Sequence, residues 1–221
     1  MGKVDKKIIF LIIIIFACSV FLGNEISNYR QLTYELNYFT FEDMSRKVIT
    51  GALGEFGKTL ASYIWIKSDF YWHEYSGDWR SEQEIMPLIK MVTFLDPTQT
   101  QAYDFGGYQL AMNLKKVKEG AAYLKEGLKN NPESPELNYT YAFISFKKIK
   151  NYHAAIEYGK RAFTLSEDKA VKMDSLRIIY NSYAELGNYP AAIYAADLML
   201  KINPQDPAAK WKIELYKNKL K

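Results

Sequence analysis

The stretch Ala52–Thr59, with the sequence ALGEFGKT, contains the residue types of a phosphate-binding loop. Glycines in such a loop let backbone N–H groups approach a phosphate, and the following lysine neutralises its charge. The loop must lie between a buried β-strand and a helix, but the preceding segment MSRKVIT is short and charged. We therefore interpret the three glycines as a small-residue turn or close helix contact, with a nucleotide-binding enzyme as a remote alternative.

Other residues that could do chemistry are too scattered to form a predictable site. Asp96, the best candidate for a magnesium ligand, is followed by Pro97, which is typical of a helix end. The two histidines, His73 and His153, lie far apart, and the single cysteine, Cys18, lies in an apolar run. A net charge of +4 is small for a nucleic-acid-binding protein. The sequence thus predicts no catalytic residue, metal, cofactor, small-molecule substrate or nucleic acid.

The N-terminal segment is apolar from Ile8 to Gly23 and follows three lysines. As a helix it would be about 24 Å long, shorter than the roughly 30 Å hydrocarbon core, but flanking lysines can reach the interface. We favour an uncleaved membrane anchor, and a cleaved signal peptide or lipidation at Cys18 remain alternatives. Each alternative places most of the chain outside the cytoplasm, and the favoured anchor predicts a protein of the bacterial cytoplasmic membrane. An uncleaved anchor at 1–24 would make it single-pass.

The second half of the chain contains internal repeats. Asn-Tyr-x-Ala-Ala-Ile begins at Asn151 and again at Asn188, and a related segment has Gly120 in place of the second alanine, Ala155. Proline follows three of the expected helix pairs, as Pro97, Pro132 and Pro204. A small residue allows two helices to pack closely, and a proline after a helix prevents its continuation. These periods of about 35 residues predict stacked helix pairs.

The small-residue and proline pattern resembles the tetratricopeptide repeat (TPR), a pair of antiparallel helices. The resemblance implies an all-α fold: a right-handed α-solenoid of three to four helix pairs over 59–221, ending in a capping helix. A helical connector at 25–58 would join it to the anchor. The order of the segments is also similar to that of bacterial membrane-anchored TPR proteins, a group from which no activity is carried over. That layout includes the segment AYDFGGYQLA at 102–111.

Aromatic residues are dense between Leu60 and Trp79, on a segment expected to be the first helix of the earliest pair. One interpretation is a helix enclosed between the solenoid and the preceding segment. The other is an aromatic patch that binds a partner. Three residues represent this patch: Trp65, Trp72 and Tyr75.

Repeat solenoids bind partners on the concave surface, which the first helices line. The repeat register puts six polar residues there: Gln109, Asn113, Thr140, Lys147, Arg177 and Asn181. Such groups can hold a peptide backbone or a carboxylate, and the alternative is that they are ordinary solvated polar residues. The sequence predicts a tethered scaffold that docks another protein or peptide of the cell envelope during assembly of a complex. The alternative is a fixed accessory subunit of a larger secretion, pilus or redox complex.

Overall fold

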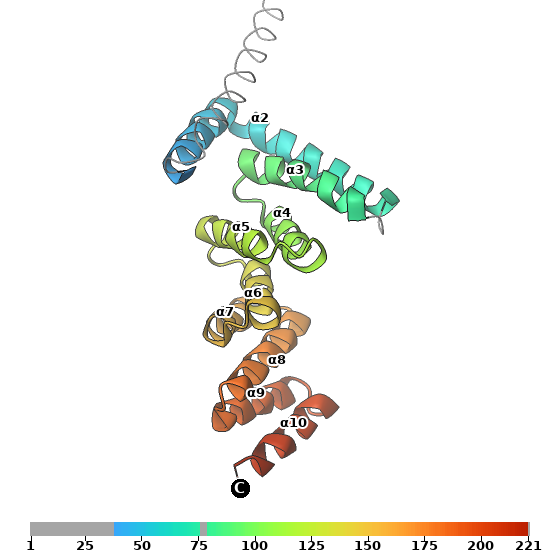
Figure 1. Ribbon diagram of the computed structural model, residues 1–221, viewed down its shortest axis with the longest axis vertical. Coiled ribbons are helices and arrows are strands. Elements are labelled where there is room, and N and C mark those ends of the chain that lie inside the picture. Colours follow the sequence, from blue (N-terminus) through green and yellow to red (C-terminus); the bar gives the residue numbers. More distant parts are fainter. Residues whose placement is uncertain (1–37, 76–78, 221) are drawn as a thin grey trace, which may run out of the picture. The chain divides into compact units, whose positions relative to one another are not determined.

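The computed structural model describes residues 38–75 and 79–220, and every regular element in these ranges is helical. The chain divides into two compact units, Met1–Ala52 and Leu53–Lys221. The all-α prediction is therefore confirmed for the described residues. In chain order the α-helices are α2 (Tyr38–Tyr75), α3 (Trp79–Leu95), α4 (Thr100–Tyr108), α5 (Val117–Asn130), α6 (Pro135–Ile144), α7 (Tyr152–Leu165), α8 (Lys169–Glu185), α9 (Tyr189–Ile202) and α10 (Pro207–Asn218) (Figure 1).

The predicted anchor at 1–24 and the first part of the predicted connector lie outside the described residues. Within 38–75 and 79–220, no helix combines the length and the apolar character needed to cross a bilayer.

The described helices of Leu53–Lys221 follow one another as four pairs and a final helix. The pairs are α2–α3, whose residues share one apolar cluster, then α4–α5, α6–α7 and α8–α9, and α10 packs on α9. The first helices α4, α6 and α8 also contact one another along the series (Figure 1). Pro97, Pro132 and Pro204 follow the ends of α3, α5 and α9, as the sequence predicts.

The repeated Asn-Tyr-x-Ala-Ala-Ile motif begins a second helix each time. Asn151 caps α7 by accepting a hydrogen bond from the Ala154 N–H at 3.0 Å. Asn188 caps α9 in the same way, 3.2 Å from the Ala191 N–H. The second alanine of each motif, Ala155 or Ala192, is fully buried. The asparagine thus satisfies a helix-end N–H group, and the alanine permits close packing.

In the α4–α5 pair, glycine replaces that alanine because the helices approach too closely for a side chain. A Cβ atom added to Gly120 would lie 2.7 Å from the Gly107 carbonyl oxygen and 2.8 Å from the Ala111 nitrogen. Gly107 in turn lies against Leu124, where an added Cβ would meet its Cγ at 2.3 Å. Two glycines on facing helices therefore bring α4 and α5 together.

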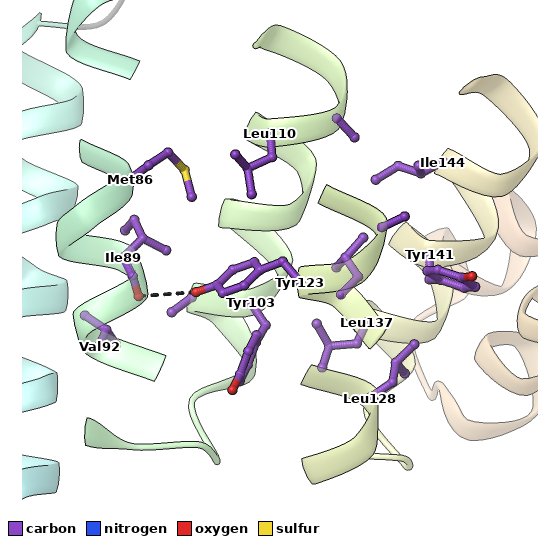
Figure 2. Close-up of a cluster of buried hydrophobic side chains, with 14 of the residues drawn as sticks. Met86, Ile89, Val92, Tyr103, Leu110, Tyr123, Leu128, Leu137, Tyr141 and Ile144 are labelled. Atoms are coloured by element: carbon purple, nitrogen blue, oxygen red, sulfur yellow. Dashed lines mark hydrogen bonds between the residues drawn. The ribbon is translucent and has the colours of Figure 1, made fainter. Parts of the chain in front are cut away.

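Two main apolar clusters fill the stack. The larger extends from α2 to α6 and includes Ile89, Leu110 and Leu137 (Figure 2). The other extends over α8, α9 and α10 and includes Met199 and Ile213. A small cluster built on Ala142, Ala155 and Ile178 lies between them, on α6, α7 and α8. Each pair thus obtains its core from its neighbours, as expected of a solenoid.

Tyr123 adds a polar connection inside the larger cluster. Its hydroxyl lies 2.8 Å from the Thr93 Oγ1 and donates a hydrogen bond to the Ile89 carbonyl at 3.3 Å (Figure 2). The buried hydroxyl groups of Thr93 and Tyr123 therefore both have hydrogen-bond partners, which avoids the cost of burying an unpaired hydroxyl. The bonds join α5 to α3 across the first two pairs.

Candidate functional site

The glycine-rich stretch Ala52–Thr59 lies inside helix α2 and is not a loop after a strand. Gly54 interrupts the helix with φ 51° and ψ −133°, a conformation that favours glycine. Lys58 forms an ion pair with Glu55 at 2.7 Å, and that hydrogen bond raises the lysine pKa. The described residues contain no strand to precede a phosphate-binding loop. The stretch therefore has the structure of a helix with a glycine break.

Of the six polar residues that the repeat register selected, Gln109 and Thr140 are buried, whereas Asn113 and Lys147 are exposed. Gln109 is buried and accepts a hydrogen bond from the Asn113 amide. Thr140 is also buried and bonds to Asp104. Lys147 is exposed, with its ammonium 5.3 Å from the centre of the Phe146 ring. Of these four residues, Asn113 and Lys147 therefore lie at the solvent-exposed surface.

The two remaining residues of that set lie on α8. Arg177 pairs with Asp174 at 2.5 Å and with Asp206 at 3.3 Å. Asp206 is buried and caps α10 by accepting from the Ala209 N–H at 2.8 Å. Asn181 donates to the Arg177 carbonyl at 2.8 Å. Arg177 therefore neutralises a buried capping carboxylate and joins α8 to the start of α10.

The structure brings a different set of side chains together along the first helices. Tyr108 of α4 stacks on Phe143 of α6 with a centroid separation of 6.4 Å. Tyr139 stacks on the same Phe143 at 6.3 Å. Helix α6, which carries Tyr139, contacts both α4 and α8, and the charges of Asp104 and Asp174 on these helices both raise the Tyr139 pKa. We name this set the first-helix strip: Asp104, Tyr108, Tyr139, Phe143, Asp174 and Arg177.

Burial and carboxylate charges shape the electrostatics of the strip. Burial raises the pKa of Tyr139, and the nearby Asp174 charge raises it further. Burial also raises the pKa of Asp104 to about 6, even though a hydrogen bond from Thr140 favours the charged form. The Glu136 charge adds to this shift. The strip thus combines half-buried rings with carboxylates and suits a ligand that has apolar and cationic groups.

A cavity of about 180 Å³ adjoins the strip at Asp104. Trp65, from the predicted aromatic patch, lines this cavity and packs edge to face on Phe105, with centroids 6.1 Å apart. Trp72 and Tyr75, the other two residues of that patch, belong to the last part of α2, and their side chains lie outside the described part of the chain. The cavity is lined by Trp65, Ser68, Ile85, Ile89, Gln101, Asp104 and Phe105.

Sequence reasoning missed most of the strip, although a signal for it exists. One position of the repeat, 35 residues apart in successive copies, holds Asp104, Tyr139 and Asp174. A second position with the same spacing holds Tyr108 and Phe143. Equivalent positions in successive repeats share one face of the stack. The residues selected from the sequence were mostly amide and cationic side chains, which do not indicate a row of aromatic rings and carboxylates.

The described residues give no indication of a metal centre. In residues 38–75 and 79–220, no three His, Cys, Asp or Glu side chains are grouped so that they could hold an ion. His153 is exposed on α7, whereas Cys18 and the His73 side chain lie outside the described part.

Solved structures similar to this chain are TPR proteins. A crystal structure of MamA is 22% identical, with a TM-score of 0.55, and the match covers 62% of this chain and 78% of that one. A double mutant of MamA RS-1 is 16% identical, with a TM-score of 0.59 and coverage of 72% and 84%. PilF of Pseudomonas aeruginosa is 13% identical, with a TM-score of 0.56 and coverage of 74% and 70%.

No protein-family model matches the sequence, and no curated protein is significantly similar to it. Similarity at this level of identity concerns the fold. The helix pairs and their structural neighbours together show that this chain has the tetratricopeptide-repeat fold.

Proposed function

We propose that this protein is a membrane-tethered scaffold that docks another protein of the cell envelope through the first-helix strip. The observation that carries this proposal is the row of half-buried rings and carboxylates that α4, α6 and α8 present together. Rings supply large contact area with few rotatable bonds, and charges around them select the partner. No catalytic arrangement is needed for such a role.

The membrane part of the proposal is supported by the apolar segment from Ile8 to Gly23 and the lysines before it. An anchor would hold the helix pairs at the outer face of the cytoplasmic membrane and raise the local concentration of membrane partners. Mass spectrometry of the N-terminal peptide from isolated membranes tests the anchor. Recovery of an intact segment supports it, and a chain that begins after residue 24 contradicts it.

A photo-cross-linking amino acid at Tyr108 tests the docking surface directly. Tyr108 has 41% of its surface exposed, so the substitution leaves the core intact. We expect the full-length chain in its own membranes to cross-link to one defined partner from this position. The matched control is Tyr194 on α9, which is 64% exposed and belongs to a second helix. Equal cross-linking to the same partner from both positions would contradict docking through the strip.

A second function, that of a fixed subunit of a larger membrane complex, is favoured by a separate observation. Phe56, Tyr63 and Ile66 of α2 are between 58% and 66% exposed and lie on one face of that helix. Apolar residues grouped in this way mark surfaces that a permanent partner covers. If this function holds, the chain without its N-terminal segment should aggregate unless all three residues are replaced by Ser.

A further inference from the structure

The cavity beside Asp104 has the dimensions of a single side chain. It lies between three helices. Helix α2 contributes Trp65 and Ser68, and helix α3 contributes Ile85 and Ile89. Helix α4 contributes Gln101, Asp104 and Phe105. A cavity of about 150 Å³ accommodates a group as large as benzene, whereas pockets for whole small molecules usually exceed about 300 Å³. At about 180 Å³, this cavity suits one long side chain of a bound protein.

Asp104 lines this cavity, and its carboxyl group is incompletely satisfied. Thr140 bonds to its carboxyl group, but the Oδ1 atom is buried without a hydrogen-bond partner. The charge that acts on Asp104 from α6 is Glu136, another carboxylate, which adds repulsion. A buried carboxylate without a positive partner is costly, so its retention points to a ligand that supplies the missing donor.

The rest of the lining also favours a cation with several donors. The faces of aromatic rings such as Trp65 and Phe105 attract cations, and Trp does so most strongly. The Ser68 hydroxyl donates its proton to the Ile64 carbonyl at 2.8 Å, which leaves it only acceptor capacity. A guanidinium has five N–H donors and no acceptor, and its planar face stacks on aromatic rings.

We propose that this cavity binds an arginine side chain of the partner protein, with Asp104 as its counter-ion and Trp65 as its aromatic wall. The inference rests on the proposed scaffold function and specifies the chemistry of the partner at one end of the first-helix strip. The guanidinium would pair with the Asp104 carboxyl group, and its methylene groups would pack on Ile85 and Ile89. The rings of the strip would contact the residues around that arginine.

Nα-acetyl-arginine methylamide is a suitable probe, and its citrulline analogue is a neutral control of almost the same shape. The chain has four tryptophans, so ¹⁵N-tryptophan labelling of the full-length protein gives four indole signals, and Trp65→Phe identifies that of Trp65. We expect the arginine probe to shift the Trp65 signal saturably, and the citrulline probe to bind at least tenfold more weakly. A lysine analogue that bound more tightly than arginine would overturn the choice of arginine.

The variant Asp104→Asn should abolish the shift, and the three other indole signals verify that it is folded. Glu133→Gln removes an exposed carboxylate from a turn and should bind the probe like the unaltered protein. Citrulline binding equal to arginine binding, or an arginine shift that persists in Asp104→Asn, would overturn the proposal. Cross-linking from Tyr108 does not depend on the probe. A partner captured there without arginine binding would therefore refute the pocket and leave the scaffold function standing.

Discussion

At the scale of single residues, Asp104 is the clearest case of a side chain whose position lowers stability. Its pKa is about 6 in the folded protein against an ordinary value of 3.8, chiefly because burial penalises the charge. Between these pH values the folded form binds more protons than the unfolded form. The contribution of Asp104 to stability therefore falls as the pH rises. A fold that tolerates such a penalty is consistent with a binding role for the residue.

Asp104→Asn should consequently stabilise the protein at pH 7, by about 1 to 3 kcal/mol, since one pKa unit corresponds to about 1.4 kcal/mol. The gain should shrink as the pH falls from 6 towards 4, where the carboxyl group becomes protonated in both states. Urea unfolding at several pH values measures this difference. Glu133→Gln should change the free energy of unfolding by less than about 0.5 kcal/mol. A loss of stability in Asp104→Asn at pH 7 would mean that a cationic group already balances Asp104.

At the scale of helices, the glycines at the α4–α5 contact explain why one repeat departs from the alanine pattern. The added Cβ at Gly120 would meet backbone atoms of α4 and η1 (Gln109–Asn113), neither of which can rotate away like a side chain. The alanines at the corresponding positions of α7 and α9 are fully buried without such a clash. The helix spacing therefore differs between pairs that share one repeat pattern.

Gly120→Ala should lower the free energy of unfolding by about 1 to 3 kcal/mol, the usual cost of an extra methyl group in a packed interior. This loss should exceed the gain in helix propensity, which is about 1 kcal/mol. Thermal or urea unfolding measures the change, and Ala122→Ser on the exposed side of α5 provides the control. An unchanged or higher stability in Gly120→Ala would show that α4 and α5 have room to separate.

At the scale of the whole chain, the described helix pairs contain two large apolar clusters, and a small third cluster lies between them. The connecting cluster is built on Ala142, Ala155 and Ile178 and is much smaller than its neighbours. In repeat proteins stability is the sum of units and nearest-neighbour interfaces, so distant pairs can open separately. The helices α8–α10 should therefore behave as a unit distinct from α3–α5.

Hydrogen exchange of the Ile213→Ala variant tests this separation. Ile213 belongs to the cluster of α8–α10, and its truncation should cost about 2 kcal/mol or more. Amides of α9 and α10 should then exchange on the order of 30-fold faster, because each 1.4 kcal/mol is a factor of ten. Amides of α5 around Leu124 should keep their rates. Equal acceleration in both regions would instead indicate one cooperative unit.

The sequence alone was sufficient for the helix pairs, because helix caps, prolines and small residues act within a few positions of themselves. Asn151 and Asn188, for example, cap helices that begin one residue later. The break at Gly54 and the pairing of Lys58 with Glu55 are also local. The residues ALGEFGKT by themselves fit a phosphate-binding loop as well as a small-residue turn, and only the short, charged segment before them favoured the turn. The membrane anchor, the envelope location and the six selected polar residues as a binding set stay predictions.

Only the tertiary structure decided which side chains meet. Arg177 contacts Asp206 although 29 residues separate them. Arg177, which the sequence predicted as a binding residue, therefore joins α8 to α10. Trp65 and Asp104 line one cavity because α2 and α4 both pack beside α3. Their juxtaposition depends on helix spacing, which the packing of glycines and large side chains sets collectively. No local pattern contains that information, so the first-helix strip and its cavity emerge only when the pairs are stacked.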